Sequence, residues 1–170
     1  MILIAMGANL PSNYGEPEET LEAAMKQLEQ QGVKILERSR IWLTPPWPYN
    51  PDDPWFRNNV ISVETELPPR DLLGLLLSIE EEFGRVRTVK NAPRLLDMDI
   101  IAYHDEIINE DHLQVPHAQM HKRSFVLMPL SDISKKWIHP ASGQTVAEMI
   151  QNLPLEEEGL EAKPMEQVAA

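Results

Sequence analysis

The stretch NVISVETELPPRDLLGLLLSIEEEFG, residues 59–84, predicts a strand followed directly by a helix. In its first third, apolar Ile61 and Val63 alternate with polar side chains, which is the period of a half-exposed strand. Two prolines then open an apolar stripe that ends at Gly84, as expected for a helix with proline in its first turn and glycine after its last. The order of the helices and strands on either side of this strand–helix pair then indicates the fold class.

Further strands and one more helix are predicted around this pair. Residues 2–6 form a short apolar run typical of an interior strand, and residues 18–30 carry apolar side chains at the spacing of an amphipathic helix. Residues 33–43 are rich in β-forming side chains, and residues 96–104 predict another strand. The order strand, helix, strand, strand, helix, strand predicts an α+β fold, a ferredoxin-like split βαβ sandwich with helices on one face of the sheet.

Additional elements are expected at the C-terminal side of this pattern. Residues 106–116 predict a short β excursion, and residues 121–133 predict a helix that ends at Pro129. Thr145 and Glu148 have the spacing of a capping box, which marks the start of another helix.

The end of the chain has a different composition from the rest. From residue 151 onward it is acidic, and no hydrophobic period continues through it. Such a segment buries too little apolar surface to fix its conformation. We therefore predict one domain over residues 1–151 and an acidic, mobile tail over residues 152–170.

The composition excludes several classes of protein. With 170 residues, 42% hydrophobic and 25% charged, the chain suits one globular domain with a real core. It has no cysteine, which excludes a disulfide scaffold, a cysteine nucleophile and thiolate-bound zinc. No apolar run approaches the ~20 residues of a membrane span, and the first residues lack the features of a signal peptide, so we expect a cytoplasmic protein. A net charge of −12 disfavours binding to nucleic acid or to an anionic membrane.

Asp97 and Asp99 stand one residue apart within the predicted strand 96–104. In a strand, residues i and i+2 point to the same face, about 6.6 Å apart at ~3.3 Å per residue. The two carboxylates therefore project together, while Met98 and Ile100 face the core. Carboxylates at this spacing repel each other unless a cation lies beside them, and oxygen ligands on one side only suit Mg²⁺. The alternative for this motif alone is a pair of strand aspartates exposed to water.

The segment RVRTVKNAPR, residues 85–94, is a basic island in an acidic chain. It holds three arginines and one lysine and contains no acidic residue. The plain explanation is a solvated loop, and the alternative is a site for a small polyanion. Carboxylates for Mg²⁺ beside guanidinium groups for phosphate form the arrangement that phosphoryl transfer requires. The aspartate pair and the basic island together predict a nucleotide site.

An aromatic, proline-rich segment supplies a third element. TPPWPYNPDDPWF, residues 44–56, contains five prolines, which exclude a regular helix or strand. Its aromatic side chains need partners, so we expect a shaped surface loop. Phe56, Phe125 and the amide of Asn58 suit a flat heterocycle that is stacked and hydrogen-bonded at its edge. Core packing is the alternative for either phenylalanine.

The common nucleotide-binding motifs are absent from the sequence, and the indication of a histidine metal site is weak. It contains no GxxxxGK[ST] and no GxGxxG motif, so it is not a P-loop protein and carries no dinucleotide-binding fingerprint. His112, His117 and His121 are spaced loosely, and surface or ligand-contacting roles are favoured over a zinc site.

Six segments carry a resemblance to a known family. In chain order they are GANL, TPPW, FRNNVISVET, LLLSIEEEFGRVR, PRLLDMDIIAY and VPHAQMHKRSF. Together they resemble the 6-hydroxymethyl-7,8-dihydropterin pyrophosphokinases of folate biosynthesis, over about residues 2–150. The family motifs P-R-x-L-D-x-D-I and V-P-H…R-x-F are both present.

The resemblance implies a reaction and its ligands. Family members transfer the pyrophosphoryl group of ATP to the hydroxymethyl oxygen of the pterin and release AMP. The resemblance therefore implies a pterin pyrophosphokinase domain over residues 1–151, with ATP as co-substrate and two Mg²⁺ ions bridging its phosphates. With the charge and composition described above, we expect small-molecule partners only, no nucleic acid, no membrane, and a monomer.

The resemblance further implies a role for individual residues. The catalytic set comprises Arg85, Arg94, Asp97 and Asp99, and the two aspartates are the metal ligands. Contacts to the nucleotide are implied for Glu80, Arg87, Ile100, His117 and Arg123. Contacts to the pterin are implied for Thr44, Pro45, Trp47, Phe56, Asn58 and Phe125.

Two other functions fit parts of the sequence. A Mg²⁺-dependent DxD nucleotidyl- or glycosyltransferase would release pyrophosphate or a nucleoside diphosphate instead of AMP. A non-catalytic ferredoxin-like binding module, for instance for RNA, would need a positive sheet face, which the charge balance disfavours.

Overall fold

The fold is that of a computed structural model, which describes residues 1–46, 48–84, 95–156 and 159–165. Its main sheet has the strand order β5-β1-β4-β3-β8, and β2 also pairs with β4. The helices and strands are β1 (Ile2–Ala8), α1 (Pro17–Gln30), β2 (Lys34–Arg38), β3 (Trp42–Thr44), β4 (Phe56–Glu64), α2 (Pro69–Glu82), β5 (Asp97–Tyr103), β6 (Ile108–Asn109), β7 (Gln114–Val115), the 3-10 helix η1 (Met120–Lys122), α3 (Ser124–Ile133), α4 (Val146–Gln151) and β8 (Lys163–Pro164).

The central strands pair as a split βαβ arrangement requires. β1 lies between β4 and β5 and is antiparallel to both. One unit is β1-α1-β2 and the other is β4-α2-β5. In the sheet, β4 therefore lies between the two strands of the first unit, and β1 lies between the two strands of the second. The α+β ferredoxin-like prediction is confirmed. The predicted β excursion is also confirmed, since β6 and β7 form a small hairpin.

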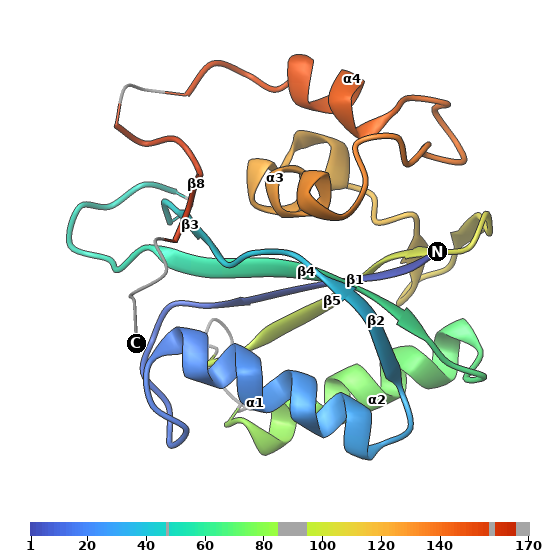
Figure 1. The fold of residues 1–170 in the computed structure, drawn as a ribbon, viewed down its shortest axis with the longest axis horizontal. Helices are drawn as coiled ribbons and strands as arrows, with labels where there is room; N and C mark the ends of the chain where they lie inside the picture. Colours follow the sequence, from blue (N-terminus) through green and yellow to red (C-terminus); the bar gives the residue numbers. More distant parts are fainter. Residues whose placement is uncertain (47, 85–94, 157–158, 166–170) are drawn as a thin grey trace.

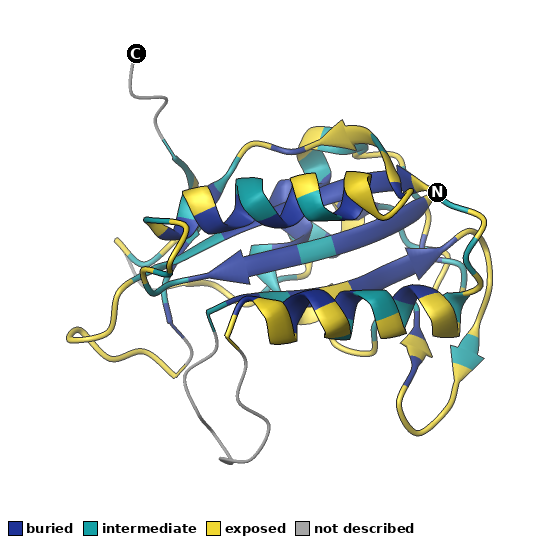
Figure 2. Cartoon of the chain, turned by 90° about the horizontal axis from the view of Figure 1, so that it is seen from below, coloured by how far each residue is buried: buried dark blue, intermediate teal, exposed yellow. Residues whose placement is uncertain are grey.

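The two helices of the split βαβ pattern, α1 and α2, lie on one face of the sheet as predicted, and the additional helices α3 and α4 cover the other face. Figure 1 shows α1 and α2 below the sheet and α3 and α4 above it. Two separate core clusters result, one under α1 and α2 around Ile4 and Met98, and one under α3 and α4 around Leu3 and Val60. The outer sides of α1 and α2 stay exposed, as Figure 2 shows. The sequence predicts α3 and α4 but not the face that they cover, because that depends on long-range packing.

The central strand β4 corrects a second prediction. Residues 59–67 were expected to form a half-exposed strand, but every residue from Asn58 to Val63 is buried. Ser62 alternates with apolar neighbours in the sequence and is nevertheless 2% exposed, because its side of the sheet lies under α3. The alternation in the sequence therefore reflects the difference in polarity between the two faces of β4, both of which are buried.

Helix α3 runs through Pro129 to Ile133, beyond the predicted end. Proline removes one backbone donor from a helix, here the one that would reach the Phe125 carbonyl. The apolar side chains Val126, Leu127 and Leu130 are buried against the sheet. Their burial offsets the missing bond, since each fully buried side chain of this kind contributes roughly 1.5–3 kcal/mol.

Helix α4 begins as predicted. Thr145 accepts a hydrogen bond from the Glu148 backbone N–H, and the Glu148 side chain accepts one in return from the Thr145 backbone N–H. The capping box is therefore present. None of the described helices is both long and apolar enough to cross a lipid bilayer.

The predicted tail contains a strand. In β8, Lys163 pairs with Leu43 of β3, and the next backbone N–H, from Met165, donates to the Ile41 carbonyl. The Lys163 ammonium also lies 5.3 Å from the ring centre of Trp55. The prediction that nothing orders residues 152–170 is therefore wrong at β8, whereas a domain limit at residue 151 stays a prediction.

The turn between α3 and α4 makes the stability of the protein sensitive to pH. The Nδ1 of buried His139 accepts hydrogen bonds from the backbone N–H groups of Ala141 and Ser142, both at 3.2 Å. Burial, with a smaller contribution from His121, lowers the pKa of His139 in the folded state. Because the folded protein favours neutral His139, this residue contributes to the free energy of unfolding. The contribution is complete above the ordinary histidine pKa of about 6.5 and is lost as the pH falls through the lowered pKa of the folded state.

We therefore expect His139→Gln to reduce the fall in Tm between pH 7.5 and pH 5.5. Thermal unfolding of both proteins at the two pH values measures the difference. His112→Gln serves as the control, because His112 is exposed. An equal fall in the Tm of wild type and His139→Gln would contradict the assignment.

Candidate active site

The two aspartates lie on β5, where the sequence places them. Asp97 pairs with Gly7 and Asp99 pairs with Ala5, while Met98 and Ile100 are buried in the core under α1 and α2. Asp99 is exposed and Asp97 is partly exposed. The predicted shared face of the two carboxylates is confirmed.

A row of paired residues crosses the sheet from Asp97 on β5 to Trp42 on β3. Gly7 pairs with Asp97 on one side and with Asn58 on the other, and Asn58 pairs in turn with Trp42. Directly opposed residues of an antiparallel sheet point to the same face. Asn58 therefore shares a face with the aspartates, and α3 packs over β4 on that side.

The amide of Asn58 is fixed by its two neighbours. Its Nδ2 donates a hydrogen bond of 2.6 Å to Oγ1 of Thr44, and both residues are buried. Its Oδ1 occupies the space beside Gly7 where any larger residue would place a Cβ. The absence of a side chain at position 7 is thus what admits the amide.

Two aromatic side chains lie on elements that adjoin this face, one on β4 and one on α3. Phe56 opens β4 and pairs with Thr44, and it is partly buried. Phe125, in the first turn of α3, packs partly buried against the core cluster that contains Val60. The guanidinium of Arg123 lies 5.3 Å from the Phe125 ring centre.

His117 lies within the electrostatic influence of Asp99 and of Arg123. Its backbone N–H donates to the Ile101 carbonyl at 2.9 Å, which ties the loop to β5. Burial lowers the pKa of His117, Asp99 opposes that shift and Arg123 reinforces it, so the imidazole is neutral near pH 7. Its Nδ1 accepts a hydrogen bond of 3.1 Å from the Gln119 backbone N–H. A neutral His117 with this bond carries its proton on Nε2.

The other predicted site residues are distributed as follows. Glu80 is 3% exposed and lies on α2, on the opposite side of the sheet from α3. The side chain of Ile100 lies in the core, so any nucleotide contact from this position would come from its main chain. Pro45 follows β3 in the predicted irregular loop, and no helix or strand lies among the described residues from Pro45 to Trp55. Four predicted residues lie outside the described part of the chain, namely Trp47, Arg85, Arg87 and Arg94.

The described residues fit a magnesium ion better than a metal held by protein alone. Among them, no group of three or more His, Asp or Glu side chains is placed to hold a metal. Two carboxylates on one exposed face suit Mg²⁺, which keeps water ligands and takes phosphate oxygens from a substrate.

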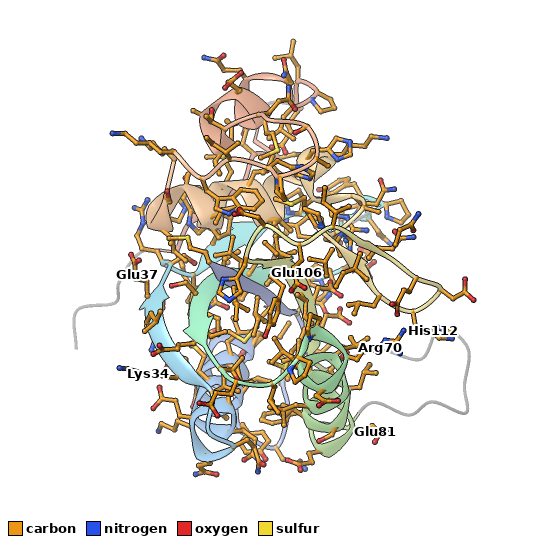
Figure 3. All side chains as sticks on the ribbon, turned by 90° about the vertical axis from the view of Figure 1, so that its right-hand side faces the viewer. Lys34, Glu37, Arg70, Glu81, Glu106 and His112 are labelled. Carbon is orange, nitrogen blue, oxygen red and sulfur yellow. The ribbon has the colours of Figure 1, made fainter. Side chains whose placement is uncertain are left out.

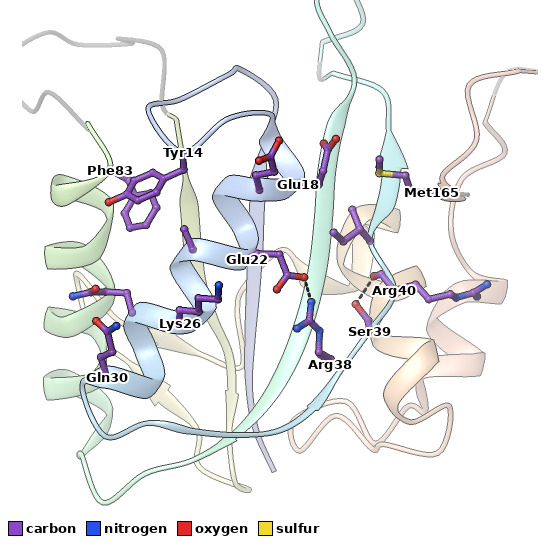
Figure 4. A pocket seen from close by; sticks show the side chains of 14 residues that line it. Tyr14, Glu18, Glu22, Lys26, Gln30, Arg38, Ser39, Arg40, Phe83 and Met165 are labelled. Carbon is purple, nitrogen blue, oxygen red and sulfur yellow. Dashed lines mark hydrogen bonds and ion pairs between the residues drawn. The ribbon is translucent and has the colours of Figure 1, made fainter. Parts of the chain in front are cut away.

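A cavity of about 1040 Å³ lies elsewhere, along the outer side of α1. Figure 4 shows Glu22 of α1 paired with Arg38 of β2 in it, and the stacked rings of Tyr14 and Phe83, 4.4 Å apart, at its other end. None of the described residues in the predicted site lines it. The chemistry of the sheet face, with its carboxylates, amide and aromatic rings, makes that face the better candidate.

Comparison with known proteins gives the family. The family model of 7,8-dihydro-6-hydroxymethylpterin-pyrophosphokinase (HPPK) matches residues 3–135. The chain belongs to this family. It is 37% identical over 145 residues to a 2-amino-4-hydroxy-6-hydroxymethyldihydropteridine pyrophosphokinase of Methylorubrum extorquens, covering 85% of this chain and 90% of the relative. A Pseudomonas aeruginosa protein of the same name is 35% identical over 165 residues, covering 96% of each chain.

Longer relatives contain a similar region. The folic acid synthesis protein fol1 of Pneumocystis carinii is 38% identical over 149 residues, which cover 88% of this chain and 20% of the relative. The chain thus spans about a fifth of the length of these fol1 relatives. Among solved structures, Plasmodium falciparum HPPK-DHPS has a TM-score of 0.68 at 15% identity, covering 88% of this chain and 42% of that chain. This likeness confirms the fold.

Two features of the site were missed by the sequence analysis. Gly7 appears in the sequence only within the GANL segment, and nothing in the sequence indicates that a side chain 51 positions later fills the space beside it. The contact of Asp132 with Trp42 was also missed, because only the tertiary structure brings the two residues together.

Proposed function

We propose that this HPPK-family protein transfers the pyrophosphoryl group of ATP to the hydroxymethyl oxygen of 6-hydroxymethyl-7,8-dihydropterin and releases AMP, as a step of folate synthesis. The observation that carries the proposal is the row from Asp97 to Asn58 across one sheet face, beside Phe56 and Phe125. Carboxylates for a metal–phosphate complex and an amide with aromatic rings for a heterocycle thus share one face.

The pterin end of the site follows from the fixed amide. A pterin ring presents both donors and acceptors along one edge, and an amide side chain offers both. Because Thr44 and Gly7 set the orientation of Asn58, the amide is positioned before the ligand binds. Phe56 and Phe125 supply aromatic faces for stacking on the two sides of the ring.

The phosphate end of the site lies over β5. We propose that Asp97 and Asp99 hold two Mg²⁺ ions, which when bound neutralise charge on the phosphates during transfer. Arg123 and the Nε2–H of neutral His117 are donors for phosphate oxygens. Arg85, Arg87 and Arg94 add positive charge in this proposal, and Glu80, Ile100, Pro45 and Trp47 keep the roles that the resemblance implies.

The bonds in the reaction balance without a redox partner. The hydroxymethyl oxygen forms a bond to the β-phosphorus, the bond from that phosphorus to the α–β bridging oxygen breaks, and AMP leaves with that oxygen. The hydroxyl proton passes to solvent. Little basic catalysis by the protein is required, because positioning and charge stabilisation carry most of a phosphoryl transfer.

Product analysis tests the proposal. The purified protein is incubated with ATP, Mg²⁺ and the dihydropterin, and the adenine nucleotides are separated by chromatography. AMP that appears only when the pterin is present supports the proposal. Release of ADP or free pyrophosphate would favour the DxD transferase alternative, and no turnover with tight binding of another ligand would favour the binding module; the family match favours neither alternative.

Phe125→Ala is expected to weaken pterin binding by about 10- to 100-fold, because stacking on an aromatic face is worth about 1–3 kcal/mol. ATP binding should change by no more than about 2-fold, since the ring is proposed to face the heterocycle of the pterin. Titration calorimetry with each ligand measures both constants. Equal losses for the two ligands would mean that Phe125 serves only the core.

The proposal also covers the setting of the protein. We propose that the chain acts in the cytoplasm as a monomer with ATP and a dihydropterin as its only partners. Size-exclusion chromatography with light scattering tests the oligomeric state directly.

A further inference from the structure

Asp132 is the acceptor of four hydrogen bonds at the end of α3. Its Oδ2 accepts from the Arg40 backbone N–H at 3.0 Å, from Arg40 Nε at 3.1 Å and from Trp42 Nε1 at 3.0 Å, and its Oδ1 accepts from Arg40 Nη2 at 2.9 Å. Arg40 also lies over the Trp42 ring, 5.2 Å from its centre. These contacts join α3 to the segment that opens β3.

Both partners of this contact lead to the proposed pterin site. Trp42 is 5% exposed and pairs with Asn58 across β3 and β4, so the indole stands next to the amide proposed to read the pterin edge. Asp132 follows Phe125 by seven residues, which is two turns of α3 and about 10.5 Å along the helix axis. Residues two turns apart lie on the same side of a helix. A contact at Asp132 therefore fixes the rotation of the helix that presents Phe125.

The first turn of α3 has one backbone hydrogen bond fewer than a regular helix. Pro129 supplies no N–H for the Phe125 carbonyl, so one of the bonds that would brace this turn is missing. The orientation of Phe125 then depends more on how α3 is seated on the sheet. Among the described residues of α3, Asp132 is the one whose side chain hydrogen-bonds to residues 40–42 at the start of β3.

We propose that Asp132 is a positioning residue for the pterin: through Trp42 and through the seating of α3 it sets the gap between Asn58 and Phe125. This inference rests on the proposed function, because it names what determines affinity at the pterin end of the same site. Asp132 does not itself touch the ligand.

The hydrogen bond from Trp42 to Asp132 contributes more to the positioning of the pterin site than the ion pair of Asp132 with Arg40. The Arg40 side chain is 56% exposed, and pairs at such exposure contribute little. The indole N–H is buried, and without its acceptor it would be left unpaired inside the protein. Burial opposes ionisation of Asp132, but the bonds from Arg40 and Trp42 outweigh it and lower the pKa of Asp132, so the acceptor stays a carboxylate at neutral pH.

Asp132→Ala is expected to raise the Kd of the pterin by about 10-fold or more, since displacement of binding groups by about 1 Å can cost up to about 10²-fold. The Kd of ATP should stay within about 2-fold of wild type. Calorimetric titration of 6-hydroxymethyl-7,8-dihydropterin, with and without a methylene analogue of ATP, measures both. The pterin KM should rise in parallel, with kcat within about 3-fold of wild type.

Milder variants separate the two bonds. Asp132→Asn keeps an oxygen that can accept from Trp42 Nε1, and Arg40→Ala keeps both the carboxylate and a backbone N–H, so each should bind the pterin within about 3-fold of wild type. Trp42→Phe lacks only the indole donor and part of the ring, and it should weaken pterin binding several-fold. The double variant Asp132→Ala/Trp42→Phe should bind the pterin about as weakly as Asp132→Ala alone, because both changes remove the same bond.

Glu110→Ala is the matched control. It breaks another arginine–carboxylate pair, in which Arg70 Nη2 lies 2.7 Å from Glu110 Oε2, away from the candidate site. Figure 3 shows Arg70 on α2, facing the β6–β7 hairpin. Both binding constants should stay at wild-type values in this variant.

The outcomes are distinct. Wild type that binds no pterin would reject the proposed function, and the inference with it. Wild type that binds the pterin, with Asp132→Ala and Trp42→Phe unchanged, would reject the inference alone. Equal loss of pterin and ATP binding in Asp132→Ala with a lowered Tm would also reject it, because that pattern is a general structural effect. If Asp132→Ala does not fold, unchanged pterin binding in Trp42→Phe overturns the inference.

Discussion

Asp99→Asn and Asp97→Asn are each expected to lower kcat by about 10²–10³-fold or more while the protein stays folded. The amide keeps the shape of the side chain and loses the charge that a metal ligand needs, and losing one such charge contact costs about this factor in a transition state. Their place on one exposed face of β5, opposite Gly7 and Ala5, is the motive for the prediction. Turnover is measured at saturating Mg²⁺, with circular dichroism to verify the fold.

Asp105→Asn is the control for this pair. Asp105 is an exposed aspartate in the turn after β5, so it has the same chemistry without a place on the sheet face. Its kcat should stay within about 2-fold of wild type. If either strand variant keeps more than a tenth of wild-type kcat at saturating Mg²⁺, the assignment of metal ligands is wrong.

Gly7→Ala is expected to weaken pterin binding by about 10²-fold. The added Cβ would overlap Oδ1 of Asn58, and the amide cannot yield without losing its bond to Thr44. Misplacing a group that reads the ligand costs up to about 10²-fold, and overpacking a buried site costs typically 1–3 kcal/mol of folding free energy. Pterin titration and thermal unfolding measure the two effects.

Two further variants test this explanation. Gly74→Ala adds the same methyl group on the exposed side of α2, where nothing lies within 4 Å, so pterin binding should not change and stability should rise by up to about 1 kcal/mol. Adding Asn58→Ala to Gly7→Ala removes the overlap and should restore Tm without restoring pterin affinity. If Gly7→Ala binds the pterin as wild type does, the proposed fixed amide has no role in recognition.

The sequence predicts the elements of this fold better than their burial. Local patterns such as the capping box at Thr145 and the prolines before α2 depend on neighbours in the chain, and the structure confirms them. Whether a strand is covered on one face or two depends on helices far away in the sequence. The burial of Ser62 under α3, and the helix that continues past Pro129, therefore could not be read from local pattern.

The same distinction holds for the candidate site. The shared face of Asp97 and Asp99 follows from the two-residue period of a strand, and so it was predictable. The pairing of Asn58 with Gly7 and the contact of Trp42 with Asp132 depend on register and helix seating, which join residues 51 and 90 positions apart. The resemblance indicates which residue types form the site, whereas the structure shows which side chains hold one another in place.

The fate of each phosphate distinguishes pyrophosphoryl transfer from other reactions of ATP. In a single turnover with the pterin and Mg²⁺, ATP labelled in its α-phosphate is compared with ATP labelled in its γ-phosphate. If the protein transfers the pyrophosphoryl group, all of the α label leaves as AMP and all of the γ label moves to a pterin carrying two added phosphates. Label from the α-phosphate in the pterin product, or γ label released as free phosphate with ADP, would contradict that transfer.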